Sequence, residues 1–238
     1  VVILDRPRHE ELIAEVRESP FIPSQFTRNQ AGMQGGEALS GLELLNAENA
    51  WREAAGVAAN YAEHLAQLGV HKQYANRGLE PYLYVHGVIS ATEWDNFFAL
   101  RCHPDAQPEF QEFAHLVRAA LVTHEPTPRP FADQGAVPGD YHEAWHLPYV
   151  SDLERNNYGL EYLKRMSAAR CAWVSYKPFD ESDAPNHVKV NRTFDKLVGE
   201  PMHASPMEHV ATPGNTHPSN FVGWCQWRHF LEEDRRHG

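Results

Sequence analysis

The sequence contains few cysteines and no long hydrophobic run. Its three cysteines, Cys102, Cys171 and Cys225, show no Cys-x-x-Cys spacing. An odd count without such spacing is typical of a protein in a reducing compartment, not of a secreted disulfide scaffold. No stretch approaches the roughly 18 apolar residues of a membrane-spanning helix, and the N-terminus carries no signal-peptide pattern. We therefore expect a soluble, cytoplasmic protein with no membrane partner.

Basic residues are also scarce. Lysine and arginine total 21 against 32 aspartates and glutamates, which gives a formal net charge of −11. General nucleic-acid binding requires a basic surface, so this charge argues against a nucleic-acid partner, although arginines gathered at one site can still bind an anion. The chain has 238 residues, 42% of them hydrophobic, and can bury a core as one domain or as two closely packed lobes.

Apolar periodicity predicts one long helix over residues 42–69, with Gly69 just beyond its C-terminal cap. Residues 82–90 then predict a short strand. We expect one side of the long helix to face the core, because its apolar residues repeat there: Leu42, Leu45, Ala50, Ala54, Val57, Ala58, Tyr61, Leu65 and Leu68.

The chain is organised around residues 86–121. Thr92 and Asp95 are spaced as a variant of the helix capping box. Arg101 lies on the same predicted helical face as three aromatic residues, Trp94, Phe97 and Phe98. A guanidinium is rarely buried without an anion, so Arg101 predicts either an ion pair or a bound anionic ligand.

A second helix is predicted after His103-Pro104, with Asp105 as its cap. Its apolar residues recur with helical period and are expected to be buried: Phe110, Phe113, Val117, Ala120 and Leu121.

Residues 125–150 are rich in proline and predict a long surface connection. Within them, His142 to His146 formally matches the zinc motif His-Glu-x-x-His. That motif needs a helix to bring both imidazoles to one face, and breakers flank this run on both sides. We therefore predict no metal site, and a zinc hydrolase remains only a minor alternative.

Patterns in the C-terminal part of the sequence predict further helices. Ser151 and Glu154 form a capping box, and a helix over residues 160–176 should direct Leu163, Met166, Ala169 and Trp173 inward. Residues 191–198 predict a shorter helix, and we expect the charged tail 232–238 to be frayed.

The segment His203-Ala-Ser-Pro-Met-Glu-His209 predicts a compact helix start, with Ser205 as N-cap and Glu208 three residues on. This structural interpretation does not account for His203 and His209. A helix N-terminus also presents free N–H groups that suit a phosphate-bearing cofactor.

Several segments together resemble the flavin-dependent thymidylate synthases, the ThyX family. The segment 203–209 is similar to that family's His-x-Ser/Thr-Pro-x-Glu-His motif. Ser90-Ala91, Asn96 to Arg101 and Ala106 to Glu109 resemble its helix-pair signature, and residues 168–176 resemble its first helix. The resemblance covers most of residues 40–122 and 160–229. It implies an α+β, helix-rich fold with a small mixed or antiparallel sheet.

The order of the motifs is unusual, because the segment 203–209 follows the helix pair instead of preceding it. This order resembles a variant of the family in phages and actinobacteria, in which an Arg-His/Ser-rich segment opens the chain. We expect such a segment to precede Val1. Trp227-Arg228-His229 faintly echoes the Arg-His-Arg motif, and we interpret it as structural. We predict a single domain over 1–238, with halves 1–124 and 151–238 joined by 125–150.

The resemblance implies FAD-dependent methylation of dUMP to dTMP with methylenetetrahydrofolate and NADPH, in a homotetramer with sites at subunit interfaces. Glu208 and Ser205 would bind the flavin, Asn96 would reach its ring, and His203 would line the folate and nicotinamide side. Arg101 and, less directly, Arg77 would bind the nucleotide, and Arg101 and His203 are the implied catalytic residues. Ser90 replaces an asparagine usual in the family. A catalytically incomplete nucleotide-binding or assembly protein is the alternative.

Overall fold

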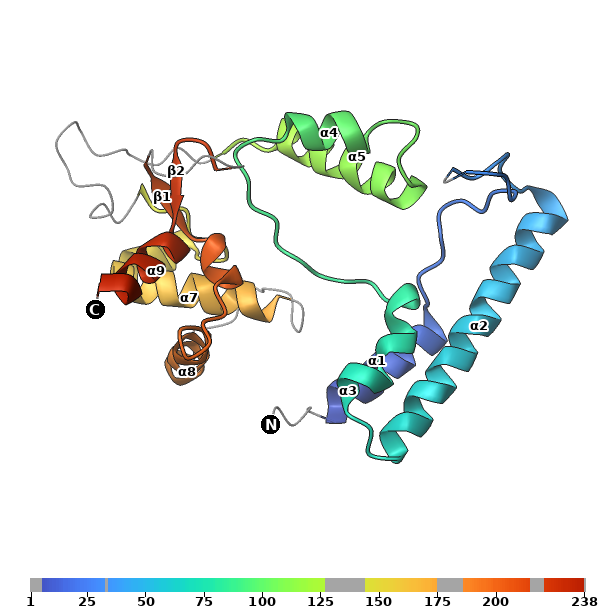
Figure 1. Ribbon diagram of the computed structural model, residues 1–238, viewed down its shortest axis with the longest axis horizontal. Coiled ribbons are helices and arrows are strands. Elements are labelled where there is room, and N and C mark those ends of the chain that lie inside the picture. Colours follow the sequence, from blue (N-terminus) through green and yellow to red (C-terminus); the bar gives the residue numbers. More distant parts are fainter. Residues whose placement is uncertain (1–5, 33, 127–143, 175–185, 215–220, 238) are drawn as a thin grey trace. The chain divides into compact units, whose positions relative to one another are not determined.

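The computed structural model describes residues 6–32, 34–126, 144–174, 186–214 and 221–237 (Figure 1). These residues are mostly helical and include one two-stranded antiparallel sheet, which confirms the predicted helix-rich α+β fold. The elements are α1 (Arg6–Glu18), α2 (Gly41–Gln67), α3 (Lys72–Ala75), the 3₁₀ helix η1 (Arg77–Tyr82), α4 (Asp95–Arg101), α5 (Pro108–Thr123), α6 (Asp152–Asn157), α7 (Leu160–Trp173), α8 (His187–Leu197), the 3₁₀ helix η3 (Ser205–Glu208), β1 (Ala211–Pro213), β2 (Trp224–Gln226) and α9 (Trp227–His237).

The chain divides into two compact units. The first comprises residues 1–85 and 97–121, and the second comprises residues 86–96 and 122–238. Within the described residues, none of the helices has the length and apolar character needed to cross a bilayer.

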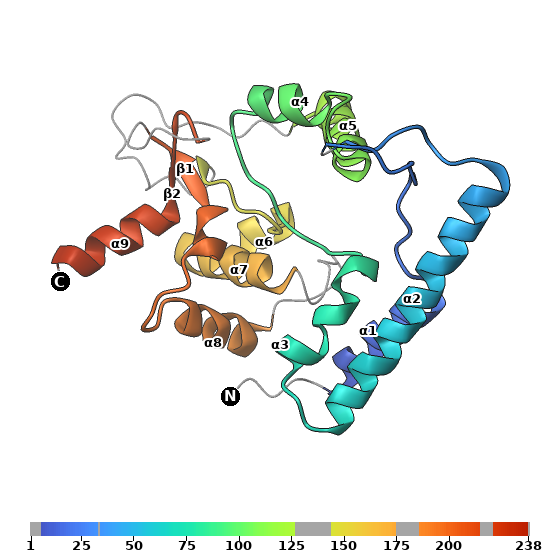
Figure 2. The same ribbon diagram turned by 45° about the vertical axis from the view of Figure 1, so that its right-hand side comes forward.

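Helix α2 organises the first unit and packs along α1 (Figure 2). Its buried residues are small, namely Ala55, Ala59 and Ala62, and they meet a core that includes Ile13 and Leu79. Alanines on the contact face allow two helix backbones to approach closely. At the other end Gly69, with φ of +76°, donates its N–H to Ala66 O, as predicted for a glycine that ends a helix.

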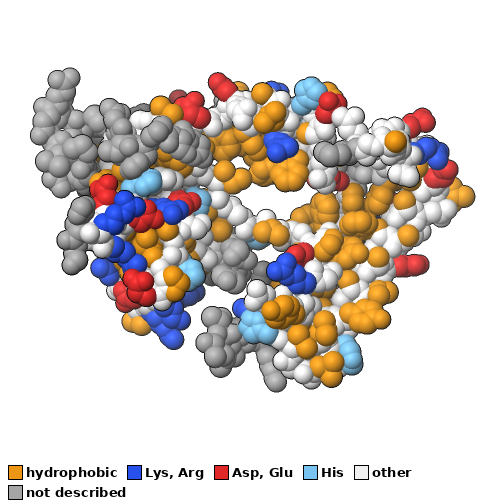
Figure 3. All heavy atoms as spheres, viewed as in Figure 1, with side chains coloured by type: hydrophobic (Ala, Val, Ile, Leu, Met, Phe, Trp, Pro, Cys, Tyr) orange, Lys and Arg blue, Asp and Glu red, His pale blue; other side chains and the backbone are white. Residues whose placement is uncertain are grey.

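The predicted core face of α2 was wrong. Its large apolar side chains are mostly exposed: Leu42, Leu45, Val57, Tyr61 and Leu68 are between 52% and 72% exposed. The periodicity identified a helix correctly, but α1 and η1 pack against the alanine face. Figure 3 shows hydrophobic side chains gathered over the surface of α2.

The strand predicted over residues 82–90 is absent from the structure. Tyr82 ends η1, and the residues that follow make no ladder, with Val85 83% and Ile89 60% exposed. An extended segment becomes a strand only when a neighbouring strand pairs with it, and alternation alone does not supply that partner.

The predicted helix pair exists as α4 and α5, but both caps and the expected burial were wrong. Helix α4 begins at Asp95 and α5 at Pro108, so neither Thr92 nor Asp105 holds the N-cap position. Phe97 packs edge-on against Phe113 with ring centroids 6.5 Å apart. Of α5, only Ala114 is buried.

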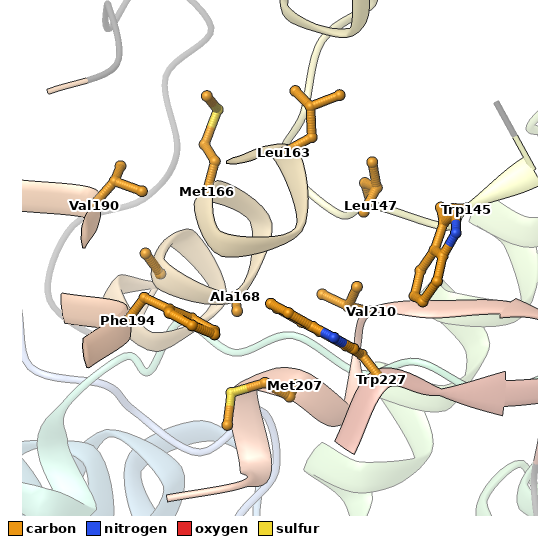
Figure 4. Packing of buried hydrophobic residues seen from close by; sticks show 11 residues of the cluster. Trp145, Leu147, Leu163, Met166, Ala168, Val190, Phe194, Met207, Val210 and Trp227 are labelled. Atoms are coloured by element: carbon orange, nitrogen blue, oxygen red, sulfur yellow. The ribbon is translucent and has the colours of Figure 1, made fainter. Parts of the chain in front are cut away.

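The second unit has its core around α7. Leu163, Met166 and Ala169 are fully buried, as predicted, and Trp173 is half-buried at the edge. Phe194 of α8 stacks on Trp227 of α9, with ring centroids 5.1 Å apart and planes 8° from parallel (Figure 4).

The capping box at the start of α6 was predicted correctly, and its glutamate also forms a buried ion pair. Ser151 Oγ accepts a bond from Glu154 N, and Ser151 N donates to Glu154 Oε2. The same carboxylate receives two bonds from Arg170 of α7, at 2.8 and 2.7 Å. Burial alone would raise the pKa of Glu154, but the bonds from Arg170 and Ser151 outweigh it and lower that pKa.

The C-terminal tail was expected to fray, but α9 continues to His237. Arg235 forms an ion pair with Glu200 at 3.0 Å, and its guanidinium also bonds the Val198 carbonyl. These contacts tie the last helical turns to the loop after α8.

We predict that Glu154→Gln costs about 3 kcal/mol of unfolding free energy, because it leaves the charge of Arg170 buried without its partner. Glu43→Gln is the control, since its pair with Arg28 is more than half exposed and such pairs contribute about 0–1 kcal/mol. Urea denaturation measures both. Equal losses in the two variants would contradict the importance of the buried pair.

Candidate functional site

The candidate site is built on η3, a single 3₁₀ turn. Met207 and Val210 are fully buried and fix this segment to the core around α7. Three polar residues beside them lie outside the core: His203 and Ser205 are exposed and Glu208 is half-buried. The segment therefore alternates apolar anchors with polar side chains that a ligand can reach.

Ser205 is not the N-cap that the sequence predicted. Ala204 occupies that position and already has helical backbone angles, φ −74° and ψ −21°. Ser205 is the first residue of the turn, and no side-chain cap bond forms there. Its exposed hydroxyl is thus not used to cap the turn.

Glu208 is held by the first residues of α9. Arg228 Nη1 forms an ion pair with Glu208 Oε1, while Arg228 Nε donates to Glu232 Oε1 at 2.7 Å. Gln226 Nε2 donates to the backbone carbonyl of Glu208 at 2.8 Å. The bonds to Glu232 and Glu208 raise the pKa of Arg228, and the bond from Arg228 lowers the pKa of Glu232.

Two long-range contacts join the segment 86–96 to the same region of the second unit. His209 Nδ1 lies 3.2 Å from Ser90 Oγ, and Thr92 Oγ1 accepts a 2.8 Å bond from Val222 N. The segment that leads into α4 is thereby tied to the residues beside η3 and β2. The contact of Ser90 is with a motif histidine, which the sequence did not predict.

His146 lies next to this region but not on a helix. Its backbone N–H donates to Ala211 O at 2.7 Å, and its carbonyl accepts from Ala211 N at 3.2 Å, so it extends the edge of β1. His142 lies outside the described residues. Among the described residues no group of three or more His, Cys, Asp or Glu side chains could hold a metal ion.

The two histidines share an environment that disfavours their charged forms. Burial, followed by the charges of Arg155 and His209, lowers the pKa of His146. Burial also lowers the pKa of His209, although nearby Glu208 acts in the opposite direction.

The structure places the remaining predicted site residues as follows. Asn96 and Arg101 both lie on α4, and both are exposed. Arg101 belongs to the first unit and lies over the ring of Phe110, 5.8 Å from its centroid. Arg77, also in the first unit, is exposed, with Nε 4.0 Å from Glu80 Oε1.

Arg228 is the residue whose role sequence reasoning missed. The sequence did contain one signal, because Arg228 and Glu232 are four residues apart and such pairs face each other on a helix. The contact with Glu208 joins residues twenty positions apart, and nothing local predicts it.

Cys171 of α7 is not suited to act as a nucleophile. Burial raises the pKa of the Cys171 thiol to about 12, so the reactive thiolate is not formed near neutral pH.

No protein-family model, curated protein or solved structure matches the chain.

We predict that Ser205→Ala changes the unfolding free energy by less than about 0.5 kcal/mol, because Ser205 does not cap η3. Ser151→Ala is the positive control and should cost about 1 kcal/mol through its lost cap. Thermal and urea denaturation of both variants measure this. A loss in Ser205→Ala as large as that in Ser151→Ala would show that Ser205 supports the turn after all.

The lowered pKa values of His146 and His209 predict acid sensitivity. In the unfolded chain a histidine has a pKa of about 6.5, so below that pH the unfolded state binds more protons than the folded state. Stability should be fully present above about pH 6.5 and decline as the pH falls further. Melting temperature measured from about pH 7.5 to 5 should fall, and less steeply in His146→Gln. A pH-independent melting temperature over that range would contradict this prediction.

Proposed function

We propose that the chain is a flavin-dependent thymidylate synthase, which methylates dUMP at C5 with methylenetetrahydrofolate and NADPH. The observation that supports this most is the segment 203–210. Met207 and Val210 are buried, while His203 and Ser205 are exposed and Glu208 is half-buried and fixed by an ion pair. A capping role for Ser205 would have explained the motif structurally, and no such cap forms.

The residues around η3 fit a flavin cofactor chemically. Ser205 offers a hydroxyl that can donate or accept, and Glu208 offers a carboxylate that accepts hydrogen bonds from flavin N–H or ribityl groups. His203 is exposed on the same loop, where it would line the folate and nicotinamide side. When bound, the flavin supplies the hydride chemistry, and the protein binds and orients the reactants.

Arg101 is suited to bind an anion. Among the described residues it forms no ion pair, so the alternative of an ordinary carboxylate partner receives no support. Its contact with the ring of Phe110 leaves the edges of the guanidinium available for hydrogen bonds. In the proposed reaction Arg101 binds the uracil nucleotide and stabilises negative charge that develops on the ring. Asn96, on the same helix, would reach the flavin ring.

The exposed apolar face of α2 supports a homotetramer. Fully burying a large apolar side chain contributes about 1.5–3 kcal/mol, and α2 with its C-cap residue Leu68 leaves five such side chains largely uncovered. Helix α5 also leaves apolar side chains uncovered: Phe110 is 52% exposed and Leu116 is 63% exposed. Packing of copies over these faces would bury them and would build the sites at subunit interfaces.

We predict that Arg101→Lys weakens dUMP binding by about 2 kcal/mol, because lysine lacks the planar fork that binds a planar ligand through two bonds. FAD affinity should be unchanged, since Glu208 and Ser205 are assigned to the flavin. Titration of the flavin spectrum with dUMP measures this in wild type and variant, with melting temperature recorded beside it.

Arg118→Lys on α5 is the matched control, because Arg118 has no assigned role, and dUMP binding should be as in wild type. If Arg101→Lys binds dUMP as tightly as wild type, Arg101 is not in the site. FAD binding without turnover by the tetramer would favour the nucleotide-binding alternative.

A further inference from the structure

Three consecutive residues at the junction of β2 and α9 each bind the segment that contains η3. Gln226 Nε2 donates to Glu208 O at 2.8 Å, Trp227 N donates to Val210 O at 2.7 Å, and Arg228 forms the ion pair with the Glu208 carboxylate. We refer to Gln226, Trp227 and Arg228 as the junction clamp.

The strand register explains why the junction clamp meets Glu208. Ala211 of β1 pairs with Gln226 of β2, and the next backbone bond along the two segments joins Val210 to Trp227. The Trp227 ring is buried and stacks on Phe194, which fixes the start of α9 to α8. Arg228 therefore starts from a rigid backbone position from which its side chain contacts Glu208.

Helix α9 holds the other side of the same guanidinium. Glu232, one turn further on, accepts from Arg228 Nε at 2.7 Å, while Nη1 binds Glu208. Arginine can bind two carboxylates in this way because its donors lie in one rigid plane. The orientation of the Glu208 carboxylate is thus set from α9.

The ion pair between Arg228 and Glu208 contributes little to the stability of the fold. The side chains of Arg228 and Glu208 are 38% and 35% exposed, and ion pairs at such exposure contribute only about 0–1 kcal/mol to stability. The placement of Arg228 between Glu208 and Glu232 is therefore not explained by the stability of the fold. Among the described residues, no hydrogen bond occupies the second oxygen of Glu208, Oε2, which leaves an acceptor with a fixed direction.

We propose that Arg228 is a positioning residue for Glu208, holding its carboxylate so that Oε2 accepts a hydrogen bond from an N–H or hydroxyl donor of the flavin. This role depends on the proposed function, because it takes the flavin as the ligand of η3. Arg228 acts through Glu208 and need not touch the cofactor.

The test compares FAD titrations of the full chain as wild type, Arg228→Gln and Arg228→Lys, with melting temperature measured for each. Arg228→Gln should weaken FAD binding by about tenfold or more and shift the visible bands of bound flavin, with an unchanged melting temperature. Arg235→Gln is the matched control on the same helix. It removes an exposed ion pair with Glu200 and should bind FAD as wild type does.

A double variant, Arg228→Lys with Glu232→Gln, distinguishes positioning of Glu208 by residue 228 from a general effect of changing α9. The single ammonium of Arg228→Lys is shared between Glu208 and Glu232, so this variant should bind FAD weakly. Adding Glu232→Gln removes the competing carboxylate and should restore most of the lost affinity.

The outcomes distinguish an error in the role of Arg228 from an error in the proposed function. If wild type binds FAD and Arg228→Gln binds it equally well, or if Arg235→Gln weakens binding as much, the role of Arg228 is wrong. Failure of the double variant to recover affinity would also overturn it. If wild type itself binds no FAD, the proposed function is wrong, and the role of Arg228 falls with it.

Discussion

Burial of Met207 and Val210 is the constraint on which the candidate site depends. Both side chains lie in the core around α7, and Met207 belongs to η3, which is a single turn of four residues. Because these apolar residues are fixed, the polar residues of the same segment must point outward. The backbone bond from Trp227 to Val210 then brings Arg228 to Glu208. A site made of one turn thus takes its rigidity from a core, a strand register and the start of a helix.

In helix α2 of the first unit, the size of an apolar residue does not predict whether it is buried. Three alanines of α2 are buried, whereas Leu42, Leu45, Val57 and Tyr61 are exposed. Periodicity could predict that residues 42–69 are helical, because both faces repeat with helical period. It could not predict which face is covered, since that depends on what packs there. By area the large residues would contribute more to a core than the alanines do, so hydrophobicity alone selects the wrong face.

The sequence predicted local features well where their partners are also local. Two examples are the capping box of Ser151 and Glu154 at α6 and the inward residues of α7. Each was predictable because it depends on the spacing of residues within one helix. It failed where a distant residue decides. Ser205 is a separate case, since it lies one position too far along to cap its turn. Thr92 resembles a cap, but its hydroxyl accepts a bond from the backbone N–H of Val222, 130 residues away. The predicted contacts of Glu208 lacked Arg228 for the same reason.

The central claim is that a flavin binds at η3, and amide hydrogen exchange with and without FAD tests it most directly. If a flavin binds there, peptides that cover residues 203–210 and the junction clamp should exchange more slowly when FAD is added. Peptides from α1 should exchange at the same rate in both conditions, because no flavin contact is assigned there. Protection confined to other segments, with unchanged exchange across η3, would contradict the claim.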